Sequence, residues 1–149
     1  MNEEIFKFLD REQLVLASKQ KRLLAFIIDE VILSVITMFV LWDKLNGGST
    51  YEEILNALQP YILYTMAIKV IYHTFFVMQY AASPGKIMMK IRVLELGSNS
   101  TPSFFCSFNR ATIRVISEMF FYAGFIWGLL DPARQTWHDK TARTVVIDA

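Results

Sequence analysis

Cysteine, histidine and net charge are all scarce in this chain of 149 residues. Cys106 is the only cysteine, so no intrachain disulfide or thiolate metal cluster can form. The two histidines, His73 and His138, have no neighbours at the spacing that metal binding or acyl chemistry needs. The net charge is +1, and no basic stretch is interleaved with aromatic residues. We therefore expect no enzymatic catalysis, no cofactor, no metal and no nucleic-acid partner.

Apolar residues, in contrast, are abundant. They make up 54% of the chain, aromatic residues make up 14%, and the mean hydropathy is +0.33, which is more apolar than an ordinary soluble domain. The stretch from Asn2 to Lys21 is polar and mixed in charge, so it does not resemble a secretory signal peptide and we expect the first apolar helix to be retained. The composition predicts one all-α membrane unit in a lipid bilayer.

Two apolar segments are long enough to cross a bilayer, which takes about 20 helical residues. The first runs from about Arg22 to Trp42, and a loop follows from Asp43 to Glu53. The second begins at Ile54 or Pro60 and reaches Met78, with Pro60 able to kink it. The sequence therefore predicts a transmembrane hairpin.

A third apolar segment, Phe104 to Leu130, is too short for two full spans. We expect a broken or re-entrant element, with its first half in the membrane interface and Arg110 and Arg114 in contact with lipid headgroups or paired internally. Gly124 and Gly128 in the second half have the spacing that permits close helix contact. A plain third crossing is the alternative.

The N-terminal residues 1–20 are expected to form an amphipathic helix, Glu3 to Gln20, ahead of a membrane domain at residues 21–149. This helix either lies on the membrane surface or packs on the rest of the chain. Lys90 to Leu96 and Thr144 to Ile147 have the composition of short strands, and we expect them to pair.

Basic residues predict the orientation of the hairpin. Lysines and arginines cluster before the first span and after the second, whereas the loop between them has only Lys44. The positive-inside rule then places both termini in the cytoplasm.

Ionisable residues within the spans are the candidate functional site. Asp29 and Glu30 lie in the first span, about 10 Å beyond Arg22, and Lys69 and His73 lie one turn apart in the second. A charge at the bilayer centre costs roughly 2.5 to 3.5 kcal/mol, so such groups face protein or trapped water. They form either part of a proton or cation path or a structural pair, in which Lys69 meets Asp29 or Glu30.

One further motif, Ser83-Pro84-Gly85-Lys86, is interpreted as a turn. A phosphate-binding loop would need glycine at position 80 and serine or threonine at position 87, where Tyr80 and Ile87 stand.

Four motifs together resemble the RDD family of small bacterial membrane proteins. They are Arg22-Leu-Leu-Ala-Phe-Ile-Ile-Asp29, Gly85-Lys86 with Ile91-Arg92-Val93-Leu94, the pair Arg110 and Arg114, and the tail Arg134-Gln-Thr-Trp-His138-Asp139 through Thr-Val-Val-Ile147. The family is named for one arginine and two aspartates, which match Arg22, Asp29 and Asp139. Where the family usually has glycine before the final Thr-Val-Val, this chain has Arg143.

The resemblance implies a helical protein of the bacterial inner membrane, with some members linked to cation/proton exchange. Our leading hypothesis is ion or proton handling with Asp29 as the protonatable centre, Glu30 as an auxiliary group, Lys69 or His73 as a modulator and Arg22 as a partner. A chain this short would need to form a homo-oligomer to enclose a path. The alternative is a non-transporting accessory or assembly subunit of a larger membrane complex.

Overall fold

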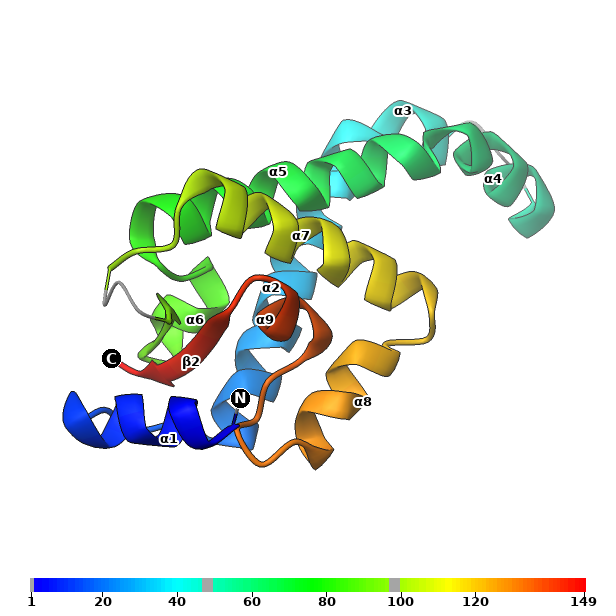
Figure 1. The fold of residues 1–149 in the computed structure, drawn as a ribbon. Coiled ribbons are helices and arrows are strands. Elements are labelled where there is room, and N and C mark those ends of the chain that lie inside the picture. Colours follow the sequence, from blue (N-terminus) through cyan, green and yellow to red (C-terminus); the bar gives the residue numbers. More distant parts are fainter. Residues whose placement is uncertain (1, 47–49, 97–99) are drawn as a thin grey trace.

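Two long helices form the frame of the protein in the computed structural model, which describes residues 2–46, 50–96 and 100–149 (Figure 1). Helix α2 spans Lys19–Val40, and a second stretch spans Tyr51–Tyr80, both long and apolar enough to cross a membrane. Large apolar side chains such as Phe39 and Leu63 remain exposed along them, free to face lipid. The predicted transmembrane hairpin is confirmed.

The second span begins earlier than expected, at Tyr51 instead of Ile54 or Pro60. Thr50 and Glu53 form a capping box that satisfies the first backbone N–H groups of α4 (Tyr51–Leu58). A 3-10 turn, η1 (Gln59–Tyr61), follows at the proline, and α5 (Ile62–Tyr80) continues the span. A short helix, α3 (Trp42–Leu45), follows α2 on the other arm of the hairpin.

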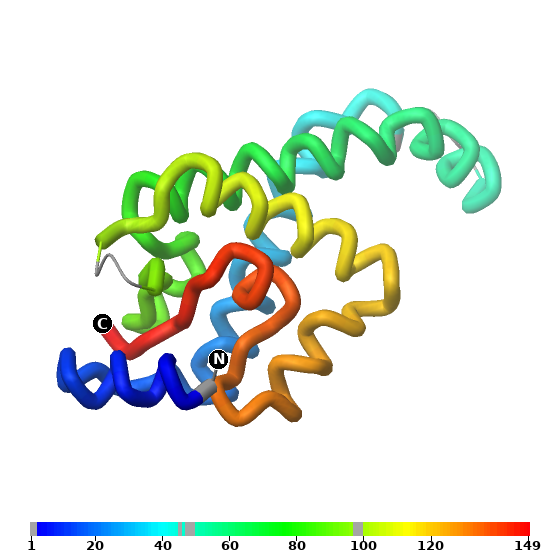
Figure 2. The backbone as a smooth tube through the Cα atoms, in the orientation of Figure 1, coloured from blue at the N-terminus to red at the C-terminus, as the bar shows by residue number. Residues whose placement is uncertain are grey.

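The third apolar segment is broken, as expected. Helices α7 (Phe104–Met119) and α8 (Ala123–Leu130) meet at an angle of 104°. Phe121 and Tyr122 adopt positive φ angles of 51° and 59° at the corner, a conformation that ends a helix. Figure 2 shows the chain reversing here and returning toward the N-terminal part of the molecule.

A two-stranded antiparallel sheet fixes the ends of this broken element. Strand β1 (Ile91–Glu95) precedes α7, and β2 (Thr144–Asp148) follows α8 and the short helix α9 (Trp137–Thr141), with Val93 opposite Val146. The predicted strand pairing is confirmed. Because both strands belong to one sheet, the chain between them leaves this sheet through α7 and returns to it through α9.

The N-terminal helix packs on this sheet. Helix α1 (Asn2–Arg11) buries Ile5 and Leu9 against Leu94, Val145 and Ile147. It ends at Arg11, well before the expected Gln20, and Leu16 instead forms a β-bridge with Ile147. The chain then turns into α2 at Ser18, whose hydroxyl accepts a hydrogen bond from the Lys21 N–H.

Helix α6 (Pro84–Met88) lies directly against α2. A Cβ atom at Gly85 would collide with the backbone carbonyl oxygen of Ala25, so only glycine permits this approach. The Ser83 to Lys86 motif, which was interpreted as a turn, instead begins α6, with Ser83 as its N-cap, and helix α6 packs on the first span.

Gly124 and Gly128 allow α8 to approach neighbouring segments closely. A Cβ at Gly128 would lie 2.6 Å from the Thr136 methyl group, and one at Gly124 would lie against the Ser117 hydroxyl. The small face of α8 thus packs on α7 and on the segment before α9, within the same chain.

Replacing both glycines with alanine is expected to overpack this contact and lower the stability by about 1–3 kcal/mol per site. The thermal midpoint in mild detergent measures the effect. Leu130→Ala, on the exposed face of the same helix, is the matched control and should leave the midpoint nearly unchanged. An unchanged midpoint in the glycine variant would contradict the packing of α8 described above.

Candidate functional site

Asp139 joins three helices through one buried carboxylate. It is 0% exposed and accepts hydrogen bonds from Arg22 of α2 and Arg110 of α7, as well as from the backbone N–H and hydroxyl of Thr136. Arg22 also donates to the backbone carbonyl of Arg134. Both oxygens of Asp139 are therefore bonded to guanidinium groups, and the three helices cannot separate without breaking these pairs.

The two arginines stabilise the ionised form of Asp139. Burial by itself would raise the pKa of this carboxyl, but Arg110 and then Arg22 outweigh it and hold the pKa well below its ordinary value. Removing one partner of such a buried pair typically costs about 3–5 kcal/mol, because the other charge stays buried.

Asp29 is sealed in a different environment. Its carboxylate is 0% exposed and accepts hydrogen bonds from the Tyr72 hydroxyl at 3.2 Å, the Ser83 hydroxyl, and the Gly85 backbone N–H at 2.8 Å. No hydrogen bond or ion pair joins it to Arg22 or Lys69 among the described residues. Asp29 thus fixes α5 and α6 onto α2 through neutral donors.

Glu30, the next residue, belongs to a ring of four charges, which we call the charge ring: Glu30, Lys69, Arg114 and Glu118. Lys69 lies 3.0 Å from Glu30 and 2.6 Å from Glu118, and Arg114 lies 3.2 Å from Glu30 and 3.5 Å from Glu118. Each cation contacts both carboxylates. The ring has no net charge, which makes its burial within the helices tolerable.

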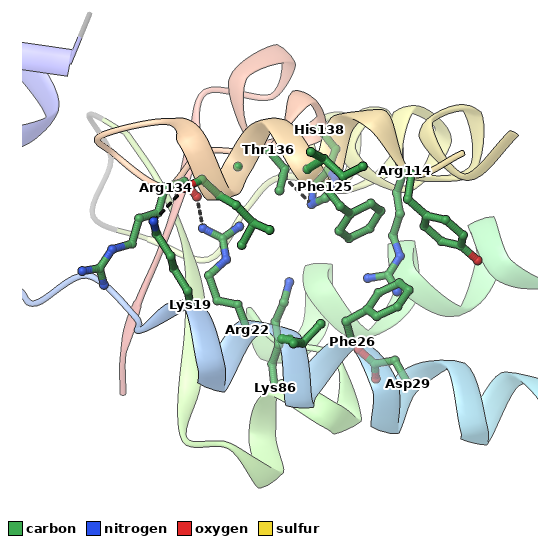
Figure 3. Close-up of a pocket in the computed structure, with 15 residues that line it drawn as sticks. Lys19, Arg22, Phe26, Asp29, Lys86, Arg114, Phe125, Arg134, Thr136 and His138 are labelled. Carbon is green, nitrogen blue, oxygen red and sulfur yellow. Dashed lines mark hydrogen bonds between the residues drawn. The ribbon is translucent and has the colours of Figure 1, made fainter. Parts of the chain in front are cut away.

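Two cavities meet α2 at the Asp29-Glu30 pair. Cavity A, about 240 Å³, lies between α2 and α8, and the α2 residues that line it run from Lys19 to Asp29 (Figure 3). Cavity B, about 380 Å³, is lined by α2 residues from Glu30 to Met38, by Leu41 just after the helix, and by Leu58, Thr65 and Lys69. The two cavities therefore divide α2 between residues 29 and 30, and they extend toward its opposite ends.

The charge ring lies between the cavities. Arg114 lines cavity A, Glu30 and Lys69 line cavity B, and the Arg114 to Glu30 contact connects the two sides. Glu30 keeps 22% of its side chain exposed, unlike Asp29. Glu30 therefore has exposed side-chain surface in cavity B, whereas Asp29, which also lines cavity A, has none.

Cavity A is strongly basic. It is lined by five cationic side chains: Lys19, Arg22, Lys86, Arg114 and Arg134. Four of them bond to carbonyl or carboxylate oxygens. Lys86 is the exception, with no hydrogen-bond or ion-pair partner among the described residues, and Figure 3 shows its amine pointing into the space between α2 and α8. Burial, then repulsion from Arg110, lowers the pKa of Lys86 well below its ordinary value.

The other expected site residues are buried or bonded within the protein. Arg110 and Arg114 were expected at lipid headgroups or in internal pairs, and the structure shows internal pairs, because α7 turns this face toward the carboxylates. His73 is buried edge-on against Tyr72 and does not join Lys69. Arg134 bonds to the Leu16 and Ala17 carbonyls.

Other residues of the site carry weaker signals in the sequence. Glu118 lies one turn after Arg114, a spacing that indicates a helical ion pair. The sequence indicated no role in the site for Tyr72 and Ser83, which bond to Asp29, or for Lys86 of α6, because only the folded chain brings them to α2.

His138 lies beside Asp139 as a neutral ring. The Thr136 hydroxyl donates to Asp139, so it accepts from the His138 Nε2–H, which leaves Nδ1 as a buried acceptor without a partner. Burial lowers the pKa of His138 well below its ordinary value of 6.5, against the attraction of Asp139.

This histidine predicts a loss of stability in acid. Because the unfolded chain takes up a proton near pH 6.5 and the folded chain does not, stability falls as the pH drops below that value, by up to about 1.4 kcal/mol per pH unit. In His138→Gln, which keeps a donor for Thr136, the thermal midpoint should fall less between pH 7.5 and 5.5 than in the wild type. Equal falls in both proteins would contradict a neutral buried His138.

The fold and these buried charges define a polytopic helical membrane protein whose intramembrane ionisable groups face protein and cavities. The family model described as RDD family matches residues 16–143, and the chain belongs to this family, as its motifs predicted. Comparisons with curated proteins and with solved structures gave no match.

Proposed function

We propose that the protein handles protons or monovalent cations across the membrane, with Glu30 as the group that exchanges the cation. The observation that carries this proposal is the division of α2, where cavity A ends at Asp29 and cavity B begins at Glu30. A cation that reaches Glu30 from cavity B is separated from cavity A by the charge ring. Intramembrane carboxylates beside cavities are the usual machinery for such transfer.

The charge ring supplies a means of coupling. Glu30 contacts Arg114 on the side of cavity A and Lys69 on the side of cavity B. A proton or cation on Glu30 would cancel its charge and weaken both contacts, so that Arg114 and Lys69 would rely on Glu118 alone. Occupancy of Glu30 would thereby bias the packing of α5 and α7 against α2.

We propose Glu30 as the exchanging carboxylate, in place of Asp29, which was the hypothesis from the sequence. Asp29 is fully enclosed and its oxygens are occupied by three neutral donors. Exchange there would require these hydrogen bonds to break, whereas Glu30 has exposed side-chain surface in cavity B. We therefore assign Asp29 a structural role in the same mechanism.

Our proposals for the location and assembly of the protein follow the hypotheses made from the sequence. We propose that the protein resides in the bacterial inner membrane with both termini in the cytoplasm, acts as a homo-oligomer or within a larger membrane complex, and has no catalytic activity of its own. Two spans and a re-entrant element leave cavity walls open to lipid, so a second copy would be needed to enclose a path.

The accessory or assembly subunit remains the second candidate. It is favoured by the exact balance of two cations and two carboxylates in the charge ring, which is also what a purely structural cluster needs. The two candidates make different predictions for a variant that lacks the Glu30 carboxylate but keeps the charge ring neutral. Flux is lost in such a variant if Glu30 exchanges the cation, whereas only stability matters if the ring is structural.

Glu30→Gln is expected to reduce proton or Na⁺ flux to the background of empty vesicles. Flux is measured in proteoliposomes with an internal pH dye under an imposed Na⁺ or K⁺ gradient. Glu52→Gln removes the same charge from an exposed position on α4 and should keep wild-type flux.

The double variant Glu30→Gln with Lys69→Gln separates exchange from structure. It leaves one cation and one carboxylate in the ring, so its thermal midpoint should recover most of what Glu30→Gln loses. Under the exchange proposal flux stays absent despite this recovery. Wild-type protein without flux, together with full recovery of stability in the double variant, would instead favour the accessory subunit.

The proposed orientation is tested by cysteine labelling in a Cys106→Ser background. An impermeant thiol reagent should label Glu52→Cys from the periplasmic side, and Lys90→Cys and Ala149→Cys only after permeabilisation. All three positions are exposed, so access depends on the side of the membrane. Labelling of Ala149→Cys in intact cells would contradict a cytoplasmic C-terminus.

A further inference from the structure

Cavity A contains a lysine that has no ion-pair partner among the described residues. Lys86 points into it without a partner among the described residues, while Arg22 and Arg114 nearby are already bonded to carboxylates. Asp29 is the one acidic residue in the lining, and its oxygens are occupied by neutral donors. The cavity therefore has the charge that an anion would complement.

The walls and depth of cavity A add a second requirement. Its rim is formed by Leu23 of α2 and by Ile126 and Leu129 of α8, which are 57%, 55% and 51% exposed. The cavity lies beside the first ten residues or so of the span, within about 15 Å of the N-terminal end of α2. A positive interior with an apolar rim at this depth matches the boundary between lipid headgroups and acyl chains.

We propose that cavity A binds the phosphate headgroup of an anionic phospholipid, with Lys86 contacting the phosphate and an acyl chain lying along Leu23, Ile126 and Leu129. A volume of about 240 Å³ is enough for a headgroup and too small for a whole lipid. The chain must therefore lie outside, over the exposed rim. This inference does not depend on ion exchange at Glu30.

The anion would satisfy the one unpaired cation of the site. An ammonium to phosphate contact is a charge-assisted hydrogen bond, and it would offset the burial and the repulsion that Lys86 experiences in the empty cavity. A zwitterionic headgroup would bring a quaternary ammonium against Arg22 and Arg114, so the cavity should prefer anionic lipid.

The test uses the full-length protein in mild detergent, titrated with dioleoyl phosphatidylglycerol, dioleoyl phosphatidylcholine or inorganic phosphate. Phosphatidylglycerol should raise the thermal midpoint and remain bound in native mass spectrometry, and the other two should not. Lys86→Gln should weaken phosphatidylglycerol binding about tenfold or more. Lys7→Gln, an exposed lysine on α1, is the matched control and should bind as the wild type does.

Two further measurements guard against a folding effect. Without lipid, Lys86→Gln should be at least as stable as the wild type, because it removes an unpaired charge from a basic cavity. Leu23→Asn with Ile126→Asn keeps Lys86 and should also weaken phosphatidylglycerol binding, through the lost apolar rim. Equal binding by Lys86→Gln and wild type would overturn the proposal, and stabilisation by inorganic phosphate to the same extent would replace the lipid by a soluble anion.

Discussion

The buried carboxylate of Asp139 is the interaction on which the rest of the structure depends. It holds Arg22 at the start of the first span and Arg110 on the first helix of the broken element, and so ties both to the tail that follows α8. Neither arginine could be buried alone, since an unpaired charge in the interior would be too costly. The sheet completes this arrangement, because β2 directly follows the Asp139 helix and pairs with β1.

Adjacent residues on a helix point about 100° apart, and α2 uses this to separate two roles. Asp29 faces α6 and is enclosed by hydroxyl and backbone donors, whereas Glu30 faces α5 and α7 and meets two cations. One carboxylate fixes the helix packing and its neighbour remains within reach of a cavity. The sequence pattern Asp-Glu cannot show which is which, because that depends on the helices that surround it.

Patterns that are local in the chain were predictable, and contacts between distant segments were not. The lengths of the apolar segments predicted both spans, and the composition of two short segments predicted the strands, because each signal lies within one segment. The N-terminal helix was predicted too long, since its apolar period continues past Arg11 while the chain leaves the helix to reach Ile147. The partners of Asp29 and the position of Lys86 in cavity A depend on Gly85, whose approach to Ala25 is a tertiary contact.

The charges of the two cavities are linked through Arg114, which lines cavity A and bonds to Glu30. An anion beside Lys86 would draw Arg114 toward cavity A, and any such shift would weaken its hold on Glu30. Conversely, a neutral Glu30 would free Arg114 for that anion. By thermodynamic reciprocity the two sites must influence each other equally. If both proposals hold, anionic lipid in cavity A would favour cation loading at Glu30, so the composition of the surrounding membrane would set how readily the charge ring opens.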